Sequence, residues 1–336
     1  MTNILSLISG SFSRALLLGT LFPLTLFALL ALLFVVPFLP ADIPHLAPLA
    51  QLDPAWKTVL FTVAVILGTG LLYSVNVPLV RLYQGYPWRF SWLGQWAVAR
   101  EQRRREWADS RRTRLRDLVD EIREENPNHP VLARLEPWRT RVALRATNEY
   151  PGPEEVLPTR LGNAIRSSEE YPRAVYGIST LSLWPRLGAV MSKEALALLD
   201  ESKAAFDFMI NACFLSGLLS GSIFVAGLLV PARIQWTEWL IQVAVAGMAS
   251  RVFYVGSVRT AVAWGDQVKS AFDLFRWDLL KKLGYLGTPD NPEEERKLWE
   301  QISRRIIYGN PPASRPPLSP YKLDEPALII SSNGDS

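Results

Sequence analysis

The stretch that decides the fold reads FDFMINACFLSGLLSGSIFVAGLLV and covers residues 206–230. It is long enough to cross a bilayer as a helix, because about 20 apolar residues span roughly 30 Å of hydrocarbon. Residues 15–39, 59–80 and 239–258 share this length and character. The first of these is too long, and its leading residues too weakly basic, for a cleaved signal peptide. The sequence therefore predicts an integral membrane protein with four retained spans.

Outside these stretches the chain is strongly polar. Charged residues make up 20% of it although the mean hydropathy is +0.10, a split typical of membrane proteins with extramembrane domains. We predict an all-α fold in which two transmembrane hairpins flank an inserted helical cytoplasmic domain. The predicted parts are a first hairpin, a cytoplasmic domain, a second hairpin, a cytoplasmic helical extension and a disordered tail rich in proline and serine, at residues 1–80, 81–205, 206–260, 261–309 and 310–336.

The distribution of basic residues predicts the orientation. The linkers at 40–57 and 231–238 contain one basic residue each, Lys57 and Arg233, whereas residues 81–203 are rich in arginine. Basic residues accumulate on the cytoplasmic side of spans. Both termini and the insert are therefore expected in the cytoplasm.

Small residues recur in the third span. Gly217 and Gly221 form a G-x-x-x-G pair, which allows two helix backbones to approach closely. A turn centred near residue 233 would place Gly217 level with Ser250 and Gly221 level with Ala246. We interpret this face as the packing surface of the second hairpin. Self-association of the chain into a homo-oligomer through the same face is the alternative.

Of the polar residues in the predicted spans, Arg251, Asn76 and Asn211 are the candidates for intramembrane polar contacts. Arg251 lies roughly 18 Å along the fourth span, past the middle of the membrane, where an arginine is costly. It could contact an anion or lipid phosphate, or line a conduction path. It could instead snorkel to the inner surface, or hydrogen-bond to Ser216 or Asn211. Asn76 is expected to make a structural contact at a kink.

Residues 91–126 have the periodicity of one long helix with an arginine-rich face. A basic stripe close to a span can bind anionic lipid headgroups, at about 1 kcal/mol per residue. An ordinary solvated helix face is the alternative. The helix that continues beyond the fourth span is expected to pack against residues 91–126.

Two further blocks read NVPLVRLYQGYPW (76–88) and RLGNAIRSSEEYPRAVYGISTLSLWPRL (160–187). In the second block a short helix over 160–170 would place Arg166 and Glu170 on one face, with Asn163 a turn earlier. The block would form either a small polar pocket or a packed elbow that docks the domain on the membrane. The residues concerned are Asn163, Arg166, Glu170, Tyr176, Trp184 and Arg186. A helix that begins near Ser192 is expected to run from this block into the third span without a break.

Both blocks resemble a family of bacterial inner-membrane proteins with N-x-P-x-x-R…G-Y-P-W and L-G-N-x-x-R-x-x-E-x-Y-P…Y-G…W-P-R-L patterns. Gln84 and Ser179 depart from the pattern, since acidic residues are usual there. The resemblance implies a bacterial inner-membrane setting and no known activity. The matching residues are Asn76, Pro78, Arg81, Gly85, Tyr86, Pro87, Trp88, Leu161, Gly162, Asn163, Arg166, Glu169 or Glu170, Tyr171, Pro172, Tyr176, Gly177, Trp184, Pro185, Arg186 and Leu187.

No sequence motif indicates catalysis. The chain has two histidines and one cysteine, Cys213, and lacks Walker, dinucleotide-binding and nucleophile motifs, so we predict no catalytic, cofactor or metal site. The interleaving of acidic with basic residues argues against nucleic-acid binding. We favour a membrane-anchored interaction or scaffold protein that presents its cytoplasmic domain to a protein partner. An oligomeric channel gated by that domain, and a membrane enzyme, are the alternatives.

Overall fold

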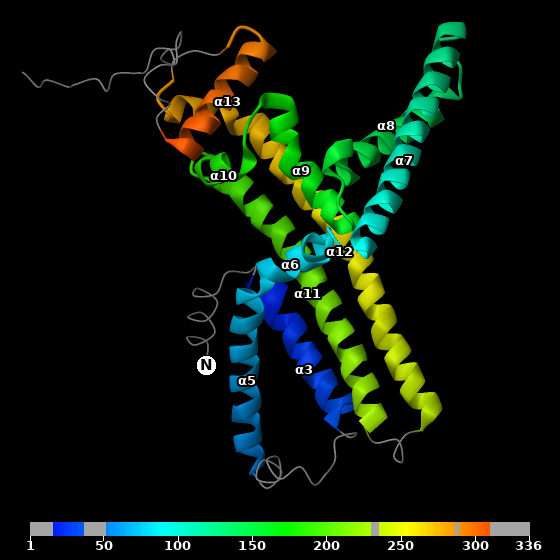
Figure 1. Cartoon of the computed structure of the whole chain (residues 1–336), viewed down its shortest axis with the longest axis vertical. Helices are drawn as coiled ribbons and strands as arrows, with labels where there is room; N and C mark the ends of the chain where they lie inside the picture. Colours follow the sequence, from blue (N-terminus) through cyan, green and yellow to red (C-terminus); the bar gives the residue numbers. More distant parts are fainter. Residues whose placement is uncertain (1–15, 37–51, 230–234, 286–288, 310–336) are drawn as a thin grey trace, which may run out of the picture.

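The computed structural model describes residues 16–36, 52–229, 235–285 and 289–309, and its architecture is all-α, as predicted (Figure 1). Four helices are long and apolar enough to cross a membrane, which identifies the chain as a candidate four-span membrane protein. The predicted tail at 310–336 lies outside the described residues. In chain order the helices are η1 (Leu17–Leu21), α3 (Phe22–Phe34), α5 (Pro54–Ser74), α6 (Asn76–Gln84), η3 (Tyr86–Trp88), α7 (Trp92–Glu125), α8 (Leu132–Glu149), η4 (Pro153–Glu155), α9 (Arg160–Tyr176), α10 (Thr180–Gly188), α11 (Lys193–Leu229), α12 (Trp236–Lys282) and α13 (Pro292–Tyr308).

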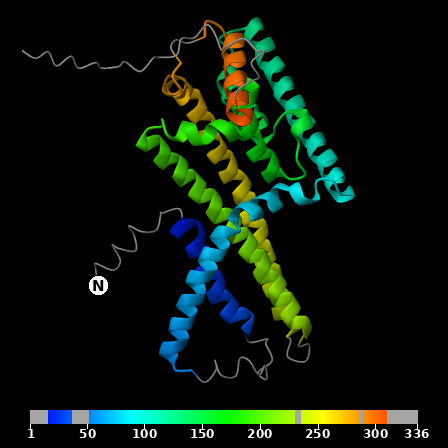
Figure 2. The same ribbon diagram turned by 60° about the vertical axis from the view of Figure 1, so that its left-hand side comes forward.

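Helices α11 and α12 form the central pair. Ser192 caps α11 by accepting a hydrogen bond from the Ala195 N–H at 3.2 Å, and the helix then runs unbroken for 37 residues. This confirms the prediction of one continuous helix into the third span. Helix α12 has 47 residues, which corresponds to about 70 Å. Both helices therefore extend from the apolar region into the polar part of the structure (Figures 1 and 2).

The contact between α11 and α12 repeats about every 3.5 residues. On α11 the contacts come from Cys213, Gly217, Ser220 and Gly227, and on α12 from Trp239, Val243 and Ser250. The Ser250 hydroxyl donates to the Cys213 carbonyl at 2.9 Å, and a Cβ on Gly217 would lie 3.2 Å from the Ser250 hydroxyl oxygen. Gly217 therefore faces Ser250, as expected.

Gly221 does not pack in the predicted way. A Cβ at Gly221 would meet no atom within 4 Å, whereas Ala246 is buried in a cluster with Leu219, Ile223 and Trp239. The reason is geometric: a seam with a period of 3.5 residues passes through positions 213, 220 and 227 and leaves position 221 to one side. The close approach occurs instead at Gly227, where a Cβ would lie 2.1 Å from Trp239 Nε1.

Replacing Gly227 with alanine should destabilise this helix pair. The added Cβ would displace the Trp239 ring, whose Nε1 donates to the Ile223 carbonyl at 3.0 Å. We expect a loss of about 1–3 kcal/mol, typical of overpacking, measured as a lower melting temperature in detergent. Gly221→Ala is the matched control and should leave the melting temperature unchanged or slightly raised, because alanine is the better helix former. Equal losses in both variants would contradict the assignment of the seam.

The second span ends earlier than predicted. Helix α5 begins after Asp53, whose side chain accepts from the Ala55 N–H at 2.8 Å, and it ends at Ser74 rather than at residue 80. Pro78 has no N–H to donate to the Ser74 carbonyl, so the helix breaks there. Helix α6 then turns away from α5 towards α12 (Figure 2).

In the polar part of the structure, the helices also pair differently from the prediction. The extension of α12 packs against α9 and α10 instead of against α7, and α7 pairs with α8. The apolar stripe of α12, which includes Phe272, is covered by Trp299 of α13 and by Leu183 of α10 and is therefore not available to α7. The α7–α8 pair, hereafter the arm, projects from the rest of the structure (Figure 1).

The ends of three helices can be compared with their predicted positions. Helix α12 ends before Gly284, which has a φ of +87°, and α13 begins after the Asn291 cap and ends at Tyr308, all as predicted. Helix α9 runs on to Tyr176 instead of ending near residue 170, because Pro172 is accommodated inside it and Gly177 at φ +77° provides the stop.

Candidate functional site

Helix α9 lies where the two sequence blocks meet. Its N-cap, Thr159, accepts from the Gly162 N–H at 2.9 Å and donates to the Tyr83 carbonyl at 2.8 Å. A Cβ at Gly162 would lie 2.5 Å from the Gln84 carbonyl oxygen, so only glycine lets the start of α9 rest on the end of α6. The blocks at 76–88 and 160–187 are therefore the two halves of one packed junction.

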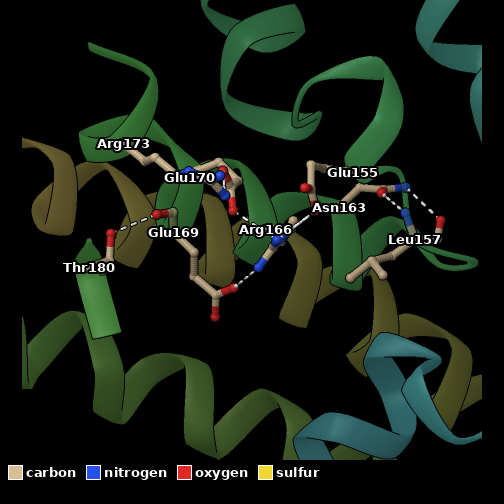
Figure 3. Close-up of polar contacts among 8 residues, drawn as sticks. All are labelled: Glu155, Leu157, Asn163, Arg166, Glu169, Glu170, Arg173 and Thr180. Atoms are coloured by element: carbon tan, nitrogen blue, oxygen red, sulfur yellow. Dashed lines mark hydrogen bonds and ion pairs between the residues drawn. The ribbon is translucent and has the colours of Figure 1, made fainter. Parts of the chain in front are cut away.

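Asn163 fixes the chain that leads into α9. Its side chain is completely buried, accepts from the Leu157 N–H at 2.7 Å and donates to the Leu157 carbonyl at 3.1 Å (Figure 3). Both ends of the amide are used on one backbone residue. Asn163 thus acts as a clamp on the loop before α9.

Arg166 lies among three carboxylates, as Figure 3 shows. Its guanidinium is 2.6 Å from Glu155, 2.8 Å from Glu170 and 3.4 Å from Glu169. Burial lowers the pKa of Arg166, but the hydrogen bond to Glu155 and the charges of Glu170 and Glu155 outweigh it, so the pKa is raised. Burial raises the pKa of Glu169, and Arg166 opposes this. The cluster ties the η4 turn to α9.

Tyr176 belongs to a different network, on the side of α9 that faces α12. The hydroxyls of Tyr171 and Tyr176 donate to Asp273 Oδ1 at 3.0 and 2.7 Å. Arg276 stacks on the Tyr176 ring at 4.3 Å and pairs with Glu295 of α13 at 2.8 Å. Burial and the hydrogen bond to Asp273 raise the pKa of both tyrosines, which therefore remain donors at neutral pH.

Lys269, which sequence reasoning missed, joins three helices. It is only 9% exposed, and its ammonium donates to Asn148 of α8 at 2.8 Å and to Ser167 of α9 at 3.3 Å. Burial lowers its pKa, with Asp266 and Asp273 acting in the opposite direction. A signal was present in the sequence, since Lys269 interrupts the apolar stripe of α12.

The buried Lys269 predicts a pH dependence of stability. The pKa of Lys269 is lowered from 10.5 in the folded state. At pH values between the folded-state pKa and 10.5, Lys269 is therefore protonated in the unfolded chain and neutral in the folded chain. Stability relative to Lys269→Met should therefore rise as the pH is raised through this window, which melting temperatures across alkaline pH would measure. Lys281→Met, at an exposed position of the same helix, is the control for removal of a positive charge. A difference between Lys269→Met and the wild type that does not change with pH would contradict the prediction.

The six residues predicted as a pocket or elbow take part in several separate contacts. Trp184 packs in the apolar core against Phe272, with ring centroids 5.9 Å apart. Arg186 is exposed and donates to the carbonyl of Ser182 in its own helix at 2.6 Å. The clamp at Asn163 and the ion-pair cluster at Arg166 and Glu170 share one face of α9, against residues 155–157, whereas Tyr176 lies on the side that faces α12. The arrangement suits a packed elbow better than a binding pocket.

Two of the polar residues of the predicted spans, Asn76 and Asn211, contact each other. Asn211 is buried and donates to the Gly19 carbonyl at 2.8 Å, and Asn76 donates to Asn211 at 3.4 Å. Gly19 lies in the π-helical turn η1, where the i−4 bonding pattern is broken and a carbonyl can be free to accept. These residues link η1, α6 and α11 by structural contacts.

Arg251 is exposed and stacks on Tyr254, 5.6 Å from the ring centroid. The alternative of a hydrogen bond to Ser216 or Asn211 does not hold among the described residues, where Asn211 is paired with Gly19 and Asn76 instead. Arg251 lies about 22 Å along α12 from Trp236, and Tyr254, one turn further, packs against Tyr83 of α6. This position near the level of α6 suits an arginine that snorkels to the inner surface.

A second feature that the sequence did not reveal is a cleft of about 500 Å³ between α7 and α8. The i,i+4 pair Trp107 and Arg111 and the spacing of Trp138, Arg141 and Arg145 were a signal, but the partner helix α8 was not predicted. Burial, and then the nearby Glu101 carboxylate, raise the pKa of Tyr150 at the edge of the cleft to about 12. The arginines of the lining are Arg104, Arg111, Arg141, Arg145 and Arg160, and the aromatic residues are Trp107, Trp138 and Tyr150.

Comparison with protein-family models, curated proteins and solved structures finds no match to this chain. The resemblance of the two blocks to a bacterial inner-membrane family therefore stays a prediction. Among the described residues, no group of three or more histidine, cysteine, aspartate or glutamate side chains is placed to hold a metal ion.

Proposed function

We propose that this chain is a membrane-anchored interaction protein, in which the spans hold a helical cytoplasmic domain that presents the α7–α8 arm to a protein partner. The observation that carries the proposal is the continuity of α11 and α12, which run from the candidate spans into the polar part without a break. A rigid connection of this kind positions a surface relative to the membrane.

The arm suits a contact surface because it is attached mainly at its base. There Lys269 of α12 donates to Asn148 at 2.8 Å, and Ser167 of α9 donates to the Thr147 carbonyl at 2.7 Å. Beyond this point the arm exposes large apolar side chains, including Leu118 and Leu144. Exposed apolar and aromatic groups beside arginines are the composition of protein interfaces.

The base of the arm suits contact with the bilayer. Phe90 and Trp92 are 85% and 77% exposed, and they lie at the start of α7, directly after α6 and η3. Arg89 stacks on Phe90 at 5.9 Å, and Arg100 stacks on Trp96 at 5.8 Å. Aromatic rings with adjacent arginines favour the headgroup layer and anionic lipids.

The proposal includes two hairpins around the domain, a bacterial inner membrane, and both termini and the arm in the cytoplasm. The support is the excess of arginine in residues 81–203 and the resemblance of the two blocks. The scaffold is preferred to a channel because Asn76 donates to Asn211 and Asn211 donates to η1, so that of these two and Arg251 it is Arg251 that is exposed. The enzyme alternative has no comparable support in the described residues.

The orientation can be tested by cysteine labelling. His129 lies in the turn at the tip of the arm, so in a Cys213→Ser background His129→Cys should react with a membrane-impermeant maleimide only after the cells are permeabilised. His45→Cys should react in intact cells. The reverse pattern would place the arm outside and overturn the orientation.

The interaction surface can be tested by photo-cross-linking in living cells. A photoreactive amino acid at Leu118 or Leu144 should give the same discrete adduct, because both positions are exposed on the arm. Leu198, which is exposed on α11 outside the arm, is the control and should not give this adduct. An adduct at twice the chain mass would identify a second copy as the partner. Equal adducts from all three positions, or none from the arm, would overturn the proposal.

A further inference from the structure

We propose that the cleft between α7 and α8 binds a phosphate-bearing anion of nucleotide size. This inference goes beyond the interaction surface, since a small ligand in the cleft requires no protein partner. It rests on three properties of the lining: guanidinium groups without carboxylate partners, a guanidinium held in place by two indole rings, and a volume suited to a small molecule.

The charges of the lining are unevenly compensated. Arg104 pairs with Glu101 at 2.7 Å, and Arg145 and Arg160 share Glu149 at 2.8 and 3.2 Å. Among the described residues, no carboxylate pairs with Arg111 or Arg141. The cleft therefore contains two guanidinium groups whose N–H donors are available to an anion.

Arg111 is oriented before any ligand arrives. Its guanidinium carbon lies 5.3 Å from the ring centroid of Trp107 on its own helix and 5.3 Å from that of Trp138 on α8. Stacking holds the faces of the guanidinium and leaves its edge, which carries the donors, free. A planar fork presented in this way matches the oxygens of a phosphate.

The cleft has the size and the walls of a small-molecule site. Its volume of about 500 Å³ lies within the range of ligand pockets, and Ala108, Val142 and Ala146 contribute short apolar side chains to its walls. The exposed faces of Trp107 and Trp138 can stack a planar ring. A nucleotide combines such a ring with phosphate groups.

Contacts at both ends of the cleft favour a compact ligand over an extended peptide. Towards the tip of the arm, Arg139 pairs with Asp120 at 3.0 Å, and at the base Tyr150 donates to Glu101 at 3.4 Å. These contacts bridge the helices and bound the space between them. They also keep the helices at a fixed separation, so that the cleft exists without a ligand.

The phosphate could come from a soluble molecule or from a lipid headgroup, and the position of the cleft favours the soluble source. Arg104 lies 12 residues beyond Trp92, which corresponds to about 18 Å along α7, and Arg111 lies further still. Helix α7 leads away from the level of α6 along this path (Figure 1). A headgroup would have to reach well above the surface to enter the cleft.

The test uses the full chain in nanodiscs of zwitterionic lipid, titrated with pyrophosphate and with ATP by calorimetry at low salt. Saturable binding is expected, and it should weaken as salt is added. Arg111→Gln and Arg141→Gln should each weaken it about tenfold or more, as expected for a lost charge-assisted hydrogen bond. Trp107→Leu should weaken ATP more than pyrophosphate if the indole stacks the base.

Matched controls come from the same two helices. Arg112→Gln on α7 and Arg134→Gln on α8 remove exposed arginines that do not line the cleft, and they should leave both affinities unchanged. Arg141→Lys keeps the charge but loses the planar fork, so an intermediate affinity is expected. Melting temperatures equal to that of the wild type would show that the glutamine variants are folded.

Two results would overturn the proposal. One is failure of the wild type to bind either soluble probe, and the other is an equal loss of affinity in the cleft and control variants. Nanodiscs that contain phosphatidylglycerol distinguish the two sources. If this lipid abolishes pyrophosphate binding in the wild type and in both control variants, a headgroup supplies the phosphate to the same site; if binding persists, the source is soluble.

Discussion

The structure depends on one constraint: a helix in lipid has to satisfy its own backbone hydrogen bonds. In α11 and α12 this regular hydrogen bonding continues unbroken beyond the apolar segments. Because these two candidate spans continue into the polar part as unbroken helices, α12 supports α9 and α10 there, and residues of α11, α12 and α13 share one apolar cluster. The mutual position of α11 and α12 is set by the approach of Trp239 to Gly227 and by hydroxyl-to-carbonyl bonds. A change in that seam would be transmitted to the polar part of the molecule.

Several polar groups in unfavourable surroundings are paired with one another. In the apolar region Asn211 accepts from Asn76 and donates to a carbonyl of the π-helical turn. In the domain, Lys269 is surrounded by acceptors from two other helices, and Arg166 by three carboxylates. Breaking such groups apart is costly because each leaves a buried partner unsatisfied. The elbow around α9 is therefore a place where specificity of packing is high and capacity for a ligand is low.

The arm differs in this respect. Its arginines outnumber the carboxylates that reach them, and its aromatic side chains are exposed instead of covered. Surplus charge and uncovered aromatic surface are features that packing alone does not require. The contrast between a satisfied elbow and an unsatisfied arm is the physical reason to assign recognition to the arm and mechanical support to the elbow.

The amino-acid sequence by itself determined the helical architecture, the number of candidate spans, the start of α11 at its cap and the ends of α12 and α13, since length, hydropathy and capping act over a few turns of one helix. It also placed Gly217 opposite Ser250, because a short turn sets the register of a hairpin. Only the tertiary structure decided which helices pair, that Gly221 lies off the seam, and that arginines and tryptophans from α7 and α8 face each other across a cleft. Those outcomes depend on contacts between residues far apart in the chain, and the period of a single helix carries no information about its partner.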